Sequence, residues 1–152
     1  MLQWENAVDG IDEQSPWNDR TDTSILTYAV IANKIDPVRE ILELYKNRSE
    51  RLLAWTFPED GLLEFGMPGR SGILHVAMML AGPDVVAELL SKGAKAHSKD
   101  VMGNDPFMMA CGFNRLSNIK VWSKMNPDWE IDRCNDRFGS TALHFAVYVL
   151  RS

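Results

Sequence analysis

Four short segments of this 152-residue chain share one pattern, which limits the possible fold more than any other feature. Each segment has a small or helix-capping residue, a large apolar residue two positions later, and an alanine three positions after that. The large residues are Leu26, Leu74, Phe107 and Leu143, with separations of 48, 33 and 36 residues. Self-similarity at such periods indicates stacked repeats, in which each unit buries its apolar face against its neighbours.

Local signals predict two helices in each unit. Asp105 is a good helix N-cap, and Pro106 suits the first helical position that follows it. Within residues 84–90 the valines and leucines fall on one face of a helix, and Gly93 supplies the backbone conformation that ends it. Residues 36–45 repeat this arrangement, so we expect the same helix pair in the first unit.

The segment Gly72-Ile-Leu-His-Val-Ala77 resembles the Thr-Pro-Leu-His-x-Ala signature of ankyrin repeats, and 33 residues is the ankyrin period. An Asp-x-x-Gly turn at residues 100–103 recurs at residues 136–139, directly before Thr141-Ala-Leu-His144. The resemblance covers about residues 19–152. It is specific in the second and fourth units and weaker in the first and third, where Thr27 and Met108 replace the histidine. It implies an all-α ankyrin-repeat solenoid of about three and a half helix-turn-helix units.

The domain organisation follows from these repeats. We expect an acidic N-terminal tail at residues 1–22 and a repeat domain at residues 23–152. The units span about 19–48, 67–99, 100–135 and 136–152, with an insertion at about 49–66. We expect the second helix of the first unit to reach about Thr56, followed by a break and a loop that packs back, although an irregular surface loop is the alternative. Burial is favoured by four large apolar residues, Trp55, Leu62, Leu63 and Phe65.

The fourth unit contains only its first helix, which leaves Phe145, Val149 and Leu150 without a covering helix. Terminal repeats normally need a polar outer face. Either the chain is a fragment of a longer repeat array, or another subunit covers this end.

The net charge of −5 belongs to the tail. Residues 1–22 hold six acidic residues and one basic residue, whereas residues 23–152 hold 15 of each. The tail also carries Trp4 and Trp17, so it is either a solvated leader or a segment that docks on the body or on a partner. The turns and first helices of the repeats carry no basic stripe, and we therefore expect no nucleic-acid partner. The absence of a signal sequence or a spanning apolar stretch, with only two cysteines, predicts a cytoplasmic, reducing location without membrane insertion.

No arrangement of residues points to catalysis, a cofactor or a metal. The resemblance implies that His75 and His144 hydrogen-bond backbone near the turns, and we expect His97 to be exposed or turn-bonding. Cys111 is expected to pack within a helix. Zinc-ligand spacings, glycine-rich phosphate loops and nucleophile elbows are missing. We therefore expect a protein that is not an enzyme.

In ankyrin repeats, the residues that bind partners project from the turn tips and the inner helices, and the resemblance implies the same here. At these positions, which line a concave groove, we predict a continuous hydrophobic band that binds a protein or peptide. The predicted partner-binding residues are Met79, Leu80, Val101, Met102, Asn104, Phe113, Arg137, Phe138 and Tyr148. A one-residue error in helix phase would place several of them in the core. The expected function is an adaptor or scaffold, and the alternative is a structural subunit of a larger assembly.

Overall fold

The computed structural model describes residues 25–61 and 66–151. Those ranges contain eight α-helices and one short 3-10 helix, and their β-structure is limited to an isolated antiparallel bridge between Thr56 and Gly72. The prediction of an all-α fold is therefore confirmed. None of the helices in these ranges is long and apolar enough to cross a lipid bilayer.

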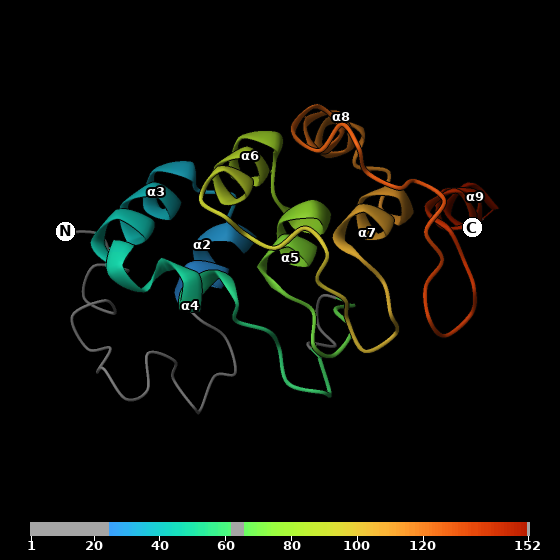
Figure 1. Cartoon of the computed structure of the whole chain (residues 1–152), viewed down its shortest axis with the longest axis horizontal. Helices are drawn as coiled ribbons and strands as arrows, with labels where there is room; N and C mark the ends of the chain where they lie inside the picture. Colours follow the sequence, from blue (N-terminus) through green and yellow to red (C-terminus); the bar gives the residue numbers. More distant parts are fainter. Residues whose placement is uncertain (1–24, 62–65, 152) are drawn as a thin grey trace.

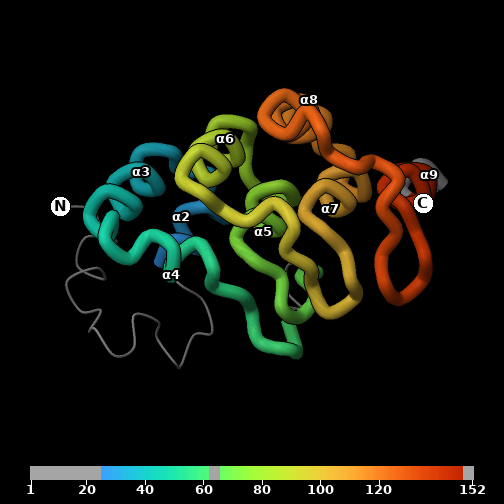
Figure 2. Tube along the Cα trace, viewed as in Figure 1, coloured from blue at the N-terminus to red at the C-terminus, as the bar shows by residue number. Residues whose placement is uncertain are grey.

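The helices form two rows (Figure 1). The inner row contains α2 (Ile25–Ile31), α5 (Ile73–Leu80), α7 (Pro106–Gly112) and α9 (Ala142–Arg151). The outer row contains α3 (Ile35–Leu44), α6 (Pro83–Ser91) and α8 (Leu116–Met125). Neighbours within each row pack against each other. The units follow the chain order along the long axis, so that the first and last described units lie at opposite ends (Figure 2).

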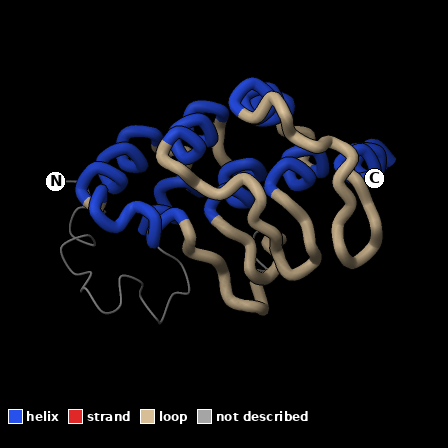
Figure 3. Tube along the Cα trace, in the orientation of Figure 1, coloured by secondary structure: helices blue, strands red, loops and turns tan. Residues whose placement is uncertain are grey.

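Long loops leave the helix rows on one side (Figure 3). We call the loops that precede α5, α7 and α9 the tip loops; they span residues 66–72, 99–105 and 134–141. Two hydrogen bonds show that the inner helices run in the same direction, because both join their C-terminal ends. Gly82 N–H donates to Asn33 Oδ1 at 2.8 Å, and Arg115 Nη2 donates to the Ala81 carbonyl at 2.6 Å. The N-termini of the inner helices therefore all face the side of the tip loops.

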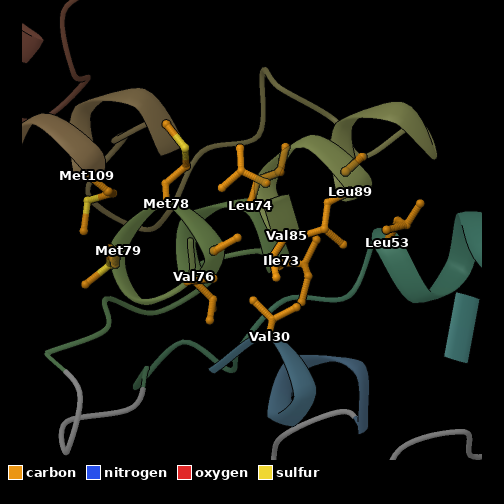
Figure 4. Packing of buried hydrophobic residues seen from close by; sticks show 14 of the residues in the cluster. Val30, Leu53, Ile73, Leu74, Val76, Met78, Met79, Val85, Leu89 and Met109 are labelled. Atoms are coloured by element: carbon orange, nitrogen blue, oxygen red, sulfur yellow. The ribbon is translucent and has the colours of Figure 1, made fainter. Parts of the chain in front are cut away.

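One buried cluster joins the units, with side chains from α2 through α9, and Figure 4 shows part of it. The repeated apolar residues Leu26, Leu74 and Phe107 lie in this cluster, as the pattern predicts. Leu143 departs from it and is 73% exposed. The reason is that α9 packs against α7, and no outer helix follows it within the described residues.

The expectation for the exposed residues of the last unit needs a correction. Phe145 is half-buried, since its ring packs beside Gly112. The exposed apolar residues of this unit include Leu143 and Val147, which lie one helical turn apart on α9. The side chains of Val149 and Leu150 lie outside the described set.

The prediction of one long helix reaching Thr56 is wrong. The helix α3 ends at Leu44, a 3-10 helix follows at Lys46–Arg48, and α4 is a separate helix at Ser49–Leu53. Tyr45 leaves the helical conformation with φ −106° and ψ 28°. After this break, the leucines at positions 52 and 53 enter the common core. The segment 62–65, where a loop packing back was expected, lies outside the described residues.

The local helix signals are confirmed where the structure describes them. The Asp105 carboxylate accepts a hydrogen bond from Met108 N–H at 2.9 Å, and Pro106 occupies the first position of α7. Gly93 follows α6 with φ +94°, a conformation that favours glycine. The helix starts and ends of the repeats therefore follow from local chemistry.

Candidate functional site

The tip loops are held together by a buried histidine, His75. Its Nδ1 accepts a hydrogen bond from Gly72 N–H at 3.1 Å, and its Nε2 lies 2.7 Å from the carbonyl oxygen of Asn104 in the next unit. The neutral tautomer with the proton on Nε2 satisfies both contacts. Burial lowers the pKa of His75 from its usual 6.5, and outweighs the Asn104 hydrogen bond and the nearby carboxylates. The backbone-bonding role expected for this histidine is confirmed.

Asn104 extends this connection to the fourth unit. Its side-chain amide donates to Asp100 Oδ2 at 3.1 Å, and its Oδ1 accepts from Asn135 Nδ2 at 2.9 Å. Asp100 also accepts hydrogen bonds from the backbone N–H groups of Met102 and Asn104, at 2.8 and 2.9 Å. We call His75, Asp100, Asn104 and Asn135 the tip network. These four side chains are buried, so they fix the relative positions of three successive units.

Asn135 is a structural residue that the sequence reasoning missed. The repeated Asp-x-x-Gly turn pairs Asp136 with Asp100, but in the structure Asn135 has the equivalent role. Its Oδ1 accepts from the backbone N–H groups of Phe138 and Ser140, both at 3.0 Å, whereas Asp136 is exposed. The adjacent Asn135 and Asp136 were both suitable turn residues, and the sequence alone does not choose between them.

Two adjoining hollows open on the second and third tip loops. The first, the apolar hollow, has a volume of about 510 Å³. It is lined by Met102, Asn104, Asn135, Phe138, Ser140, Phe145 and Tyr148. The second, the cationic hollow, has a volume of about 390 Å³. It is lined by Arg70, Lys99, Asp100, Val101, Met102, Gly103, Asp136 and Arg137. Met102 lines both hollows, so they form one continuous surface.

The structure brings together five of the nine predicted partner-binding residues as accessible parts of this surface. Met102, Phe138 and Tyr148 line the apolar hollow, while Val101 and Arg137 line the cationic hollow. Phe138 is 66% exposed and Tyr148 is 73% exposed. Such apolar exposure on adjoining residues is typical of an interaction surface.

Leu80 and Phe113 do not join this surface. Leu80 is the last residue of α5, and Phe113 follows the last residue of α7, so both lie at the helix ends remote from the tip loops. Phe113 is exposed and Leu80 is half-buried, but neither lines either hollow. The band that was expected along the whole groove is therefore concentrated at the tips.

Two predicted contact residues are corrected by the structure. Met79 is only 2% exposed because α5 has α2 on one side and α7 on the other. Tyr148 occupies the equivalent position on α9. It is exposed because α9 has an inner-row neighbour, α7, on one side only. Asn104 is also buried; it forms part of the floor of the apolar hollow, with its amide already bonded within the tip network.

Arg70 is a further residue of this surface that the sequence reasoning missed. It is exposed, lines the cationic hollow and has φ +61°, an uncommon conformation for a residue other than glycine. The sequence contained a partial signal, because Pro68 and Gly69 mark a tight turn immediately before it.

The remaining titratable groups have structural surroundings. Burial, with a smaller contribution from Asp105, raises the pKa of the Cys111 thiol to about 11, so it is protonated at neutral pH. Burial also raises the pKa of the Asp105 carboxyl. The exposed His97 packs on Trp129 and accepts a hydrogen bond from Arg133 at 2.6 Å. No cluster of three or more potential metal-ligating side chains occurs among the residues that the structure describes.

Comparison with known proteins adds no identification at this point. No protein-family model matches the chain, and no curated protein matches it. The class of this protein therefore has to be argued from its own residues and from the surface they form.

Proposed function

We propose that this chain is an ankyrin-type repeat protein that binds a protein or peptide partner at its tip loops, without catalysis. One observation carries the proposal: exposed Phe138 and Tyr148 lie with Met102 in a hollow on a rigid, hydrogen-bonded frame. Aromatic residues and methionine are well suited to interface anchors. The tip network supports this reading, because a preorganised surface loses little conformational freedom on binding.

A random peptide library displayed on phage tests this proposal with the full chain as bait. Phe138→Ser removes one of the two exposed aromatic side chains that line the hollow, and Leu44→Ser is a matched control on α3, where Leu44 is 60% exposed. We expect peptides that are enriched on the wild type and the control to be lost on Phe138→Ser. Unchanged melting temperatures would show that both variants fold. Equal enrichment on all three proteins, or none on the wild type, would refute the proposal.

A second candidate function is supported by the end face of α9. Leu143 and Val147 are exposed there, although the residues equivalent to Leu143 in the earlier units, Leu26, Leu74 and Phe107, are buried. A neighbouring subunit that covered this face would make the chain a permanent part of a larger assembly. Leu143→Glu with Val147→Glu should then leave the chain folded but prevent its assembly, as measured by light scattering of the co-expressed complex. Normal assembly of the double variant would exclude this role.

A further inference from the structure

The N-terminal leader, residues 1–22, carries the chemistry that the two hollows lack. We propose that this leader binds the tip loops of its own chain, with Trp4 in the apolar hollow and the following carboxylates at the cationic hollow. The inference rests on the proposed function, since it uses the same surface, and it identifies an internal occupant for that surface. The leader would then compete with any partner.

The charges of the leader and of the cationic hollow are complementary. The leader has a net charge of −5, while the rest of the chain is balanced. In the cationic hollow, Lys99 is paired with Asp136 at 3.1 Å, and the Asp100 carboxylate is occupied by N–H donors. Arg70 and Arg137 line the same hollow, and neither forms an ion pair with a described residue. Two positive charges are therefore available for carboxylates of the leader.

The two hollows adjoin each other in a way that fits the sequence of the leader. Arg137 stands at their junction, with Nη1 3.2 Å from Met102 Sδ and the guanidinium carbon 5.6 Å from the centre of the Phe138 ring. A ligand that fills both hollows needs an aromatic side chain directly beside a carboxylate. The dipeptide Trp4-Glu5 provides this arrangement. The apolar hollow, at about 510 Å³, is also large enough for an indole ring.

The leader joins the rest of the chain at α2, within reach of the hollows. The described chain begins at Ile25, the first residue of α2, and the N-termini of all inner helices face the tip loops. Packed helices lie about 8–10 Å apart, so two to three helix spacings, roughly 20–30 Å, separate α2 from the hollows. An extended chain covers about 3.3 Å per residue, which gives Trp4 a reach of about 70 Å and Trp17 about 26 Å. The reach of Trp4 therefore exceeds the distance to the hollow, whereas the reach of Trp17 is about equal to it.

The covalent link makes even a weak contact effective. A segment joined to the same chain at such a distance has an effective concentration at the hollow of order 1 mM. An individually weak aromatic contact with two charge pairs would then be substantially populated. A partner must displace the leader, so the leader raises the partner concentration needed for binding.

The test uses nuclear magnetic resonance of the ¹⁵N-labelled full chain. Trp4→Ala should shift the amide signals of residues 135–141 and of Tyr148, because the indole ring leaves the apolar hollow. Trp17→Ala is the matched control, with the same residue type lost from the same leader, and should leave these signals unchanged. Arg137→Glu should reproduce the effect of Trp4→Ala, and 0.5 M salt should reduce the difference between wild type and Trp4→Ala.

Three outcomes would overturn the inference. The tip signals could remain unchanged in Trp4→Ala, or shift equally in both tryptophan variants. They could also change on dilution of the wild type from 500 to about 20 μM, which would show that the leader comes from a second copy. If one of these results occurs while Phe138→Ser still abolishes peptide enrichment, only the leader proposal fails. If Phe138→Ser has no effect on peptide enrichment but Trp4→Ala shifts the tip signals, the proposed function fails and the leader contact stands.

Discussion

Replacement of His75 by alanine tests the tip network directly. The two histidines at this repeat position, His75 and His144, have the same local contact. In each, Nδ1 accepts a hydrogen bond from the backbone N–H three residues earlier, at 3.1 and 3.0 Å. They differ in burial, because His75 is fully buried and His144 is exposed. His75 alone also contacts the next unit, through the carbonyl of Asn104.

The size of the expected stability loss follows from the groups that lose a hydrogen-bond partner. His75→Ala leaves the buried Gly72 N–H without an acceptor, which costs about 1–3 kcal/mol. The Asn104 carbonyl loses the bond from His75 but still accepts from Asp100 N–H at 3.0 Å, so this loss is about 0.5–1.5 kcal/mol. The expected loss of unfolding free energy is therefore about 1.5–4.5 kcal/mol by these two terms, before lost packing is added. In His144→Ala, water replaces the imidazole, so we expect a loss below about 1 kcal/mol. For a chain of this size, the melting temperature of His75→Ala should then lie roughly 2–15 °C below that of His144→Ala.

Urea unfolding followed by circular dichroism measures both variants against the wild type. The comparison requires equal denaturant slopes, which show that the same surface is exposed on unfolding. Losses that agree within about 1 kcal/mol for the two variants would refute the reasoning. Such a result would mean that the buried hydrogen bonds to His75 give no net stability, or that water enters the site.

Three further predictions concern individual groups. The unfolded chain protonates His75 near pH 6.5 and the folded chain only at lower pH, so unfolding free energy should fall as pH drops below about 6.5. Melting temperatures measured between pH 8 and 5.5 should therefore fall with pH in the wild type, and this dependence should be absent in His75→Ala. The Cys111 thiol, with a pKa of about 11, should react with iodoacetamide at pH 7.5 at least tenfold more slowly than the exposed Cys134, as peptide mass spectrometry would show; equal rates would contradict its burial. Gly103→Ala should destabilise the chain by about 1 kcal/mol or more beyond Gly139→Ala in thermal unfolding. Both glycines have positive φ, but only a Cβ at position 103 would collide with the next tip loop; equal melting temperatures would show that the loop yields.

The parts of the fold that the sequence predicts are those determined by local chemistry. The N-cap at Asp105, Pro106 after it and the end of α6 at Gly93 depend on residues within one or two helical turns. The break at Tyr45 was missed because the apolar spacing continues through it. A 3-10 turn and a new helix bring the next leucines into the core, and the periodicity of one straight helix does not reveal that path.

The candidate site was predicted less completely, because exposure is decided by neighbours distant in sequence. Met79 and Tyr148 occupy equivalent repeat positions, yet one is buried between two helices and the other is open to solvent. The repeat pattern places both residues on the same face of their helices, but it does not show which helices lie on either side. The cationic hollow was missed for a similar reason, since Arg70 and Arg137 come from tip loops 67 residues apart in the sequence.

Asn104 shows how stability and the proposed binding surface are connected. Its carbonyl accepts from His75, its amide bonds Asp100 and Asn135, and its side chain forms part of the floor of the apolar hollow. The same hydrogen bonds that stabilise the stack therefore set the distance between the second and third tip loops. If Phe138 anchors a partner, its position depends on this network, because the Phe138 N–H donates to Asn135. The buried polar groups thus fix the backbone that carries the exposed aromatic ring, which a purely apolar tip would leave less defined.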